Sequence, residues 1–280
     1  MSSQKLWSCS RTTTNKIVLN EKDFCLFFIF YEINNMNNLN KAILYYSIQY
    51  NGDWTKIAKA IKNKEPYKIY DYPFSYVTIV DEDYPSCFKK LRYPPWILFY
   101  IGNIQLLKQK CIGIVGARNC SHQALLNTQE VTNYLKNKYC IVSGLAKGID
   151  AMAHTTAIHH QTIGIIGCGI NRIYPKENIE LFQMMKERQL IISEYPMNVA
   201  PLAKHFPWRN RLIAACVDAL IVIEAKYKSG TMLTVNECLE LSKPIYCLPT
   251  AFENKEFPGC NYLISNGANI LYDIKELDDI

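Results

Sequence analysis

One short segment of the sequence mixes basic and aromatic side chains with no acid among them. It reads Lys204-His205-Phe206-Pro207-Trp208-Arg209-Asn210-Arg211. Cationic groups neutralise phosphates and aromatic rings stack on unpaired bases, so this composition favours single-stranded nucleic acid as the ligand. A structural alternative stays open, in which the aromatic rings lie in the core and the arginines pair with carboxylates such as Glu194 and Glu224.

Glycine-containing turns that lead into helix-like segments form a second kind of candidate site. Backbone amides at such turns and at helix N-termini bind anions, and a nearby cation strengthens the attraction. Each turn taken alone is equally well explained as an ordinary connection or helix cap, and Asp150 reads first as a cap. Several of them on one sheet are more informative and predict a phosphate-binding edge. The residues are Gly116, Ala117 and Arg118; Ser143, Gly144, Lys147 and Gly148; and Ser229, Gly230 and Thr231.

The sequence lacks the patterns that bond-breaking sites usually carry. No His, Cys and carboxylate set has metal-ligand spacing, no G-x-S-x-G turn is present, and spacing forces no nucleophile–base pair. We therefore expect a binding protein that is not an enzyme and needs neither metal nor cofactor.

The elements that must position these residues follow from a regular alternation after Lys110. Apolar runs that do not alternate in polarity predict strands buried on both faces, and amphipathic stretches between them predict covering helices. This pattern indicates an α/β fold with an extended, Rossmann-like, doubly wound, mostly parallel sheet, whose ligands bind at the carboxyl ends of the strands. The expected strands are 111–115, 139–143, 162–167, 190–193, 219–223, 244–248 and 268–271. The expected helices are 123–136, 151–159, 179–188, 211–216 and 232–241.

The residues before this alternation predict a smaller unit. Helical patterns cover 24–33, 40–50 and 54–61, with Asn40 and Asp53 as expected N-caps. A β-rich connector with strands at 76–80 and 97–101 follows. We expect a disordered leader at 1–20, a small N-terminal helical domain at 21–70 and the Rossmann-like domain at 71–280.

Composition narrows the class of protein without identifying it. The chain has 280 residues, of which 49% are hydrophobic and 20% charged, so wholesale disorder is excluded. The formal net charge of +6 permits a nucleic-acid partner without requiring one. The eleven cysteines of the chain include no C-x-x-C pair, and we expect them to be buried free thiols. No apolar run spans a bilayer and no secretory signal opens the chain, so we expect a cytoplasmic protein without a membrane partner.

Seven strings of the sequence, spread over residues 76–272, closely resemble the DNA-processing protein A (DprA/Smf) family. They occur in the family's order and at its spacing, which makes the resemblance specific. The helices at 21–63 resemble the family's SAM-like domain only in position and character. The strings are Ile-Val-Gly-Ala-Arg (114–118), residues 142–154, residues 167–178, Ser-Glu-Tyr-Pro (193–196), residues 205–214, residues 224–231 and residues 259–268.

This resemblance implies a protein that binds and protects incoming single-stranded DNA, forms a homodimer and helps load the recombinase RecA during natural transformation. The family's pocket motif falls on Gly116, Ala117 and Arg118, and its base-contacting aromatic falls on Phe206. Arg209, Asn210 and Arg211 lie in the same basic segment. The resemblance also places the dimer surface at the C-terminal end of the Rossmann-like domain, with Leu263, Ile264 and Tyr272 as candidates.

Two departures from the family pattern stand out. Ala117 replaces the hydroxyl residue of the pocket motif. The family often has a lysine three residues before the phenylalanine. That position is Ala203 here, and a lysine stands one residue later, at Lys204. The chain is also expected to lack the C-terminal winged-helix domain that some members carry.

A second hypothesis comes from an enzyme class. Nucleotide phosphoribohydrolases of the LOG-like type also place a Gly-Thr pair at a helix start, in a P-G-G-x-G-T-x-x-E pattern whose glutamate assists glycosidic cleavage. Here the position of that glutamate is Thr234, and the nearest glutamate is Glu237, which disfavours this alternative.

Overall fold

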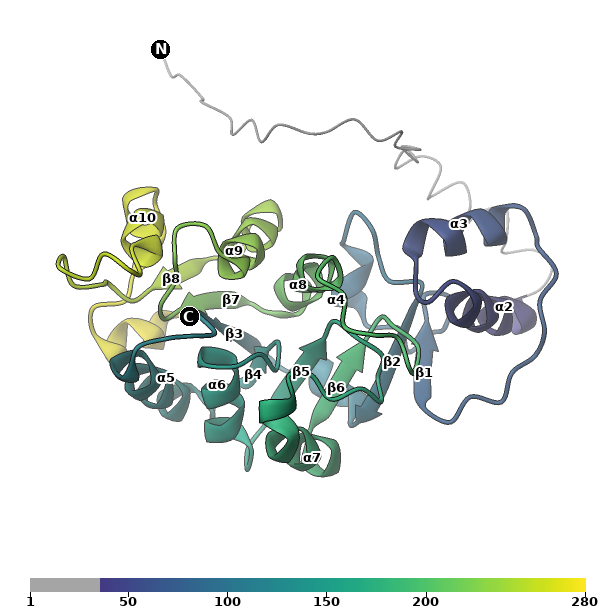
Figure 1. Cartoon of the computed structure of the whole chain (residues 1–280), viewed down its shortest axis with the longest axis horizontal. Coiled ribbons are helices and arrows are strands. Elements are labelled where there is room, and N and C mark those ends of the chain that lie inside the picture. The colour runs from purple at the N-terminus through teal and green to yellow at the C-terminus, as the bar shows by residue number, and fades with distance from the viewer. Residues whose placement is uncertain (1–35) are drawn as a thin grey trace, which may run out of the picture. The chain divides into compact units, whose positions relative to one another are not determined.

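The computed structural model describes residues 36–280, within which Leu39–Ile280 form one compact unit (Figure 1). The predicted leader at 1–20 and the predicted helix at 24–33 lie outside the described residues. Two helices precede the sheet, α2 (Met36–Gln49) and α3 (Trp54–Lys62). Asp53 caps α3 as predicted, because its carboxylate accepts the N–H of Lys56 at 3.0 Å. The prediction that Asn40 is an N-cap is wrong, since that residue lies inside α2.

Tryptophan side chains attach α3 to the chain that leads into the sheet. The indole of Trp54 donates to the carbonyl of Pro94 at 2.7 Å, and the indole of Trp96 donates back to the carbonyl of Trp54 at 3.1 Å. Their rings also pack against each other, with centroids 5.4 Å apart. These contacts fix the start of α3 against the Rossmann-like part of the chain. A separate helical domain at 21–70 stays a prediction.

The described strands form one sheet in the order β1-β2-β6-β5-β4-β3-β7-β8-β9. β2 pairs antiparallel with β1 and with β6, and all other neighbours are parallel, which confirms the predicted mostly parallel sheet. The strands are β1 (Ser75–Thr78), β2 (Ile97–Gly102), β3 (Cys111–Val115), β4 (Cys140–Ser143), β5 (Thr162–Ile166), β6 (Leu190–Ser193), β7 (Ala219–Val222), β8 (Ile245–Cys247) and β9 (Asn269–Ile270).

Helices cover both faces of this sheet, as Figure 1 shows. On one face lie α5 (His122–Leu135), α6 (Ile149–Ala157) and α7 (Ile179–Arg188). On the other lie α8 (His205–Cys216) and α9 (Gly230–Glu240), with α10 (Gly259–Ser265) against β8. The short α4 (Ser86–Lys89) packs on α8. The central strands β3 to β7 are buried along their whole length, as their unbroken apolar sequences predict.

Short 3₁₀ helices complete the connections at η1 (Ile104–Lys108), η2 (Lys176–Asn178) and η3 (Ile274–Asp279). The largest difference from the predicted elements concerns α8, which begins at His205 and not at Arg211. Pro207 suits the first turn of this helix, where backbone N–H groups have no intrahelical partner to lose. The basic and aromatic segment is therefore the start of a helix.

Candidate nucleic-acid interface

The order of the strands creates a switch point between β3 and β7. The chain runs from β3 outward through β4, β5 and β6, and then returns by α8 to β7 on the other side of β3. Ligands of doubly wound sheets bind where the strand order reverses, outside the carboxyl ends of the strands. A cavity of about 730 Å³ lies at this point, which we call the switch-point pocket. Its lining includes Gly116, Ala117, Arg118, Asn119, Asp150, Tyr174, Phe206, Arg209, Asn210, Lys226, Ser229, Gly230 and Thr231.

The turn after β3 is held in place by its backbone. The N–H of Ala117 donates to the carbonyl of Glu224 at 2.8 Å, and the hydroxyl of Thr231 donates to the carbonyl of Gly116 at 3.0 Å. Arg118 is exposed and has no ion pair among the described residues. Its guanidinium carbon lies 5.3 Å from the centroid of the Phe206 ring. The turn thus presents a free cation beside an aromatic face.

A second aromatic ring, which the sequence did not single out, stands beside Phe206. Tyr174 follows β5 in the chain, and its ring centroid lies 5.4 Å from that of Phe206 at an interplanar angle of 34°. Tyr174 is 40% exposed and Phe206 is half-buried, so part of this ring pair is open to solvent. Two adjoining aromatic rings next to a guanidinium can stack an unpaired base and bind its phosphate together.

The loop after β4 is held by a buried carboxylate, and its Gly144 and Lys147 line a small recess beside Arg118 and Phe206. The buried carboxylate of Asp150 accepts the N–H of Gly144 at 3.0 Å, so this amide is not free to meet an anion. Burial raises the pKa of the Asp150 carboxyl, while the nearby Arg209 guanidinium and the Gly144 amide lower it. Gly148 has φ of +72°, and a Cβ there would meet the carbonyl oxygen of Ala117 at 2.4 Å. This loop therefore buttresses the turn after β3.

Two further residues of this loop also make internal contacts. The hydroxyl of Ser143 is fully buried and donates to the carbonyl of Ile114 at 2.7 Å, which takes it out of reach of a ligand. Lys147 is partly exposed and forms an ion pair with Glu177.

Arg209 lies beneath the pocket and is only 5% exposed. Its guanidinium donates to the carbonyl of Ile165 at 2.6 Å and packs so closely on Gly144 that a Cβ there would meet a guanidinium nitrogen at 1.8 Å. Burial lowers the pKa of Arg209 to about 10, and the carboxylate of Asp150 opposes that shift. The side chain remains cationic at neutral pH and adds positive potential to the pocket floor.

The start of α9 forms the opposite wall of the pocket. Ser229 is its N-cap but makes no capping bond, and its hydroxyl is buried without a hydrogen-bond partner among the described residues. The amide of Asn210 donates to the carbonyl of Gly230 at 3.3 Å. Lys226 also lines the pocket and pairs with Glu256 at 2.8 Å, both side chains being at least half exposed. A helix N-terminus and a lysine thus face the same space as Arg118.

The helical start of α8 separates residues that the sequence grouped together. Phe206, Arg209 and Asn210 line the switch-point pocket, whereas Lys204 lines a different cleft together with Trp208. This division follows from the helical period, because positions i, i+3 and i+4 share a face.

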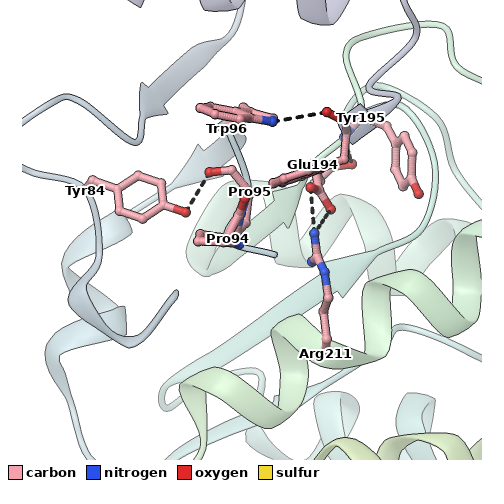
Figure 2. A network of polar contacts seen from close by, with 9 residues as sticks. Tyr84, Pro94, Pro95, Trp96, Glu194, Tyr195 and Arg211 are labelled. Atoms are coloured by element: carbon pink, nitrogen blue, oxygen red, sulfur yellow. Dashed lines mark hydrogen bonds and ion pairs between the residues drawn. The ribbon is translucent and has the colours of Figure 1, made fainter. Parts of the chain in front are cut away.

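Arg211 is not brought to the pocket and is 4% exposed. One guanidinium nitrogen donates to both carboxylate oxygens of Glu194 at 2.7 Å, as Figure 2 shows. Its guanidinium carbon also lies 4.2 Å from the centroid of the Trp208 ring. The structural alternative predicted for the arginines is thus confirmed for this residue. Glu224, the other carboxylate considered, accepts hydrogen bonds from the backbone and hydroxyl of Ser121 instead.

The carboxylate required by the enzyme hypothesis is not among the described residues that line the pocket. Thr234 lines the wall where a glutamate would assist glycosidic cleavage, and Glu237 does not line the cavity. Among the described lining residues, Asp150 is the sole carboxylate, and it holds the loop after β4.

No cluster of three or more His, Cys, Asp or Glu side chains suited to a metal ion occurs in the described part of the chain. Within residues 36–280, no helix is both long and apolar enough to cross a bilayer.

The candidate dimer residues differ in their exposure. Tyr272 is 69% exposed and follows β9, the edge strand of the sheet, on which Ile270 is 43% exposed. Ile264 is half-buried on α10. Leu263 is only 7% exposed and packs inside its own chain, so it offers little surface to a partner.

Comparison with known proteins gives consistent matches over the Rossmann-like region. A DNA processing protein DprA from Streptococcus pneumoniae is 38% identical over 200 residues, which cover 71% of each chain. The Bacillus subtilis DprA is 35% identical over 209 residues, covering 72% of this chain and 69% of that protein.

Solved structures agree with these relatives. The DprA structure from Streptococcus pneumoniae superposes with a TM-score of 0.72 at 31% identity, over 89% of this chain and 96% of that one. A DprA structure from Helicobacter pylori, reported for its single-stranded DNA binding mode, gives 0.68 at 32% identity over 74% and 95%. The family model described as DNA recombination-mediator protein A matches residues 75–279. The chain therefore belongs to the DNA-processing protein A (DprA/Smf) family.

Proposed function

We propose that this protein binds single-stranded DNA at the switch-point pocket and acts as a recombination mediator. The observation that carries the proposal is that the ring of Phe206 adjoins both the guanidinium of Arg118, at 5.3 Å, and the ring of Tyr174, at 5.4 Å. The name of the matching family and the DNA-binding mode reported for the Helicobacter pylori relative support it.

Each wall of the pocket has a distinct role in this proposal. Arg118 binds a phosphate directly, and the open N-terminus of α9 at Ser229 and Gly230 binds a neighbouring one. Phe206 and Tyr174 stack a base. Arg209 contributes charge from below without contacting the strand, because its side chain is buried.

The same geometry favours single strands over duplex. A base can stack on the exposed part of Phe206 and Tyr174 only after it has left its neighbours and its partner, and in duplex DNA this unstacking costs a few kcal/mol per base.

Fluorescence anisotropy with oligo-dT and a matched duplex tests the proposal. We expect tighter binding of the single strand, and a large loss of affinity for Arg118→Ala. Arg188→Ala is a matched control, because Arg188 is an exposed arginine at the end of α7 and does not line the pocket. Equal affinity for both DNA forms, or equal effects of the two substitutions, would contradict the proposal.

We also infer that the pocket binds nucleotides without cleaving their glycosidic bonds. The carboxylate of Asp150 is occupied by the Gly144 amide, and no other carboxylate lines the pocket among the described residues. Incubation with nucleoside monophosphates should release no free base.

The wider role is proposed on the basis of family membership. We propose that the protein protects incoming single-stranded DNA and helps load RecA in the cytoplasm during natural transformation, acting as a homodimer. The exposed edge near β9, with Ile270 and Tyr272, is the surface we assign to the dimer contact. A molar mass twice that of the chain in light scattering, and faster RecA assembly on protein-coated single strands, are the expected results.

A further inference from the structure

A second cleft, of about 710 Å³, lies on the other side of the first turn of α8 from the switch-point pocket. The loop between α2 and α3, the first turn of α3 and part of the chain between 195 and 208 line it. Lys56 and Lys204 are its cations, and both are exposed and free of ion pairs among the described residues. Asp53 is the single carboxylate in the described lining, and it caps α3. The cleft therefore carries net positive charge.

A ridge only one backbone segment wide separates the two cavities. Along it, Ala200, Leu202 and Lys204 line the second cleft, while Pro201 and Ala203 line the switch-point pocket. Neighbouring residues therefore belong to opposite cavities, so the two cavities adjoin along the whole ridge.

The helix that follows continues this division. Phe206 lies on the pocket side, whereas His205 and Trp208 lie on the cleft side. His205 is 6% exposed, and its Nδ1 has no hydrogen-bond partner among the described residues. Trp208 is half-buried. The cleft thus combines free cations with a partly exposed aromatic ring, which are groups suited to a nucleotide.

We infer that single-stranded DNA bound in the switch-point pocket continues over this ridge into the second cleft, where Lys56 and Lys204 bind its phosphates. The inference rests on the proposed function of the pocket. A strand longer than the pocket must leave it, and a route over the ridge keeps its phosphates beside positive charge. The loop between α2 and α3 and the first turn of α3 thereby become part of the DNA-binding surface.

Binding of an oligo-dT series from about 4 to about 20 nucleotides tests this path, because the shortest strands fill the pocket alone. Lys56→Ala should leave the affinity for short strands unchanged. It should weaken the binding of long strands roughly fivefold at about 0.1 M salt. It should also lower the log–log salt slope of their affinity by about 0.7, the value for one phosphate on a single strand.

A charge insertion gives an independent reading. Thr55 is exposed in the first turn of α3 and lines the cleft, so Thr55→Glu adds a negative charge there while favouring the helix N-terminus. This variant should also weaken the binding of long strands without affecting that of short ones. Lys62→Ala is the matched control, since Lys62 is an exposed lysine of the same helix that does not line the cleft.

The outcomes separate this inference from the function on which it rests. Arg118→Ala should weaken the binding of strands of every length. If it does, while Lys56→Ala and Thr55→Glu bind long strands like wild type, the pocket binds DNA but the path through the second cleft is wrong. Equal loss for short and long strands in the cleft variants would likewise overturn the path. Failure of wild type to bind any strand would overturn both.

Discussion

Phe206 is the residue that joins the cationic and the aromatic parts of the site. Its ring contacts a guanidinium from the turn after β3 and a phenol from the loop after β5, although these residues lie far apart in the sequence. The basic and aromatic composition around Phe206 predicted a base contact. Tyr174 could not be found in the same way, because no local pattern connects residue 174 to residue 206, and only the folded chain brings the two rings together.

Truncation of this ring tests the base contact. Phe206→Ala should weaken binding of oligo-dT by about 1–3 kcal/mol, the range for one base stacked on an aromatic side chain. An abasic strand of the same length should bind both proteins almost equally, because its phosphates are unchanged and it has no base to stack. Phe206→Tyr serves as the control that keeps the ring. An equal loss of affinity for the abasic strand would show that the substitution acts on the pocket as a whole.

At the scale of elements, α8 determines which basic residues reach DNA. The sequence predicted a helix only from Arg211, because the preceding residues lack an apolar period and include Pro207. Proline is tolerated in a first helical turn, so the helix starts at His205 and its period distributes the segment over two cavities and the core. The strands were predicted well because apolar runs specify burial directly. The orientation of individual cations depended on a helix start that the sequence did not mark.

The ion pair between Arg211 and Glu194 joins α8 to the segment after β6 and should contribute to folding, not to binding. Both side chains are about 95% buried, and burial raises the pKa of the Glu194 carboxyl while Arg211 lowers it. Arg211→Met leaves a buried carboxyl without its cation and should lower the free energy of unfolding by about 3–5 kcal/mol. Urea denaturation measures this.

A paired substitution provides the control for that result. Adding Glu194→Met to Arg211→Met should restore much of the lost stability, since no buried charge then remains. If Arg211→Met were as stable as wild type but failed to bind oligo-dT, the arginine would be a direct DNA contact instead.

At the scale of the whole molecule, the placement of charge is more informative than its sum. The net charge of +6 is modest. Near the pocket, Lys147 and Lys226 are paired with Glu177 and Glu256 on the surface, and such exposed pairs contribute little energy and exchange readily with a ligand. Arg118 has no such partner among the described residues, which makes it the cation of the pocket lining that is most available to a phosphate.

The architecture explains why these charges meet. The reversal of strand order between β3 and β7 brings the turns after both strands to one point, where α8 and α9 start against them. The alternating pattern of strands and helices predicted this class of fold, and the rule that ligands bind at strand carboxyl ends predicted the edge. Neither the pattern nor the rule predicted that the Gly144 amide, in the loop after β4, would donate to the carboxylate of Asp150.

The salt dependence of oligo-dT binding tests the central claim most directly, because it counts the phosphates that the protein neutralises. Wild type should lose affinity linearly on a log–log scale with a slope of about 0.7 per phosphate, and Arg118→Ala should lower that slope by about 0.7. A slope near zero, or an identical slope for wild type and Arg118→Ala, would contradict a phosphate-binding site at the switch point.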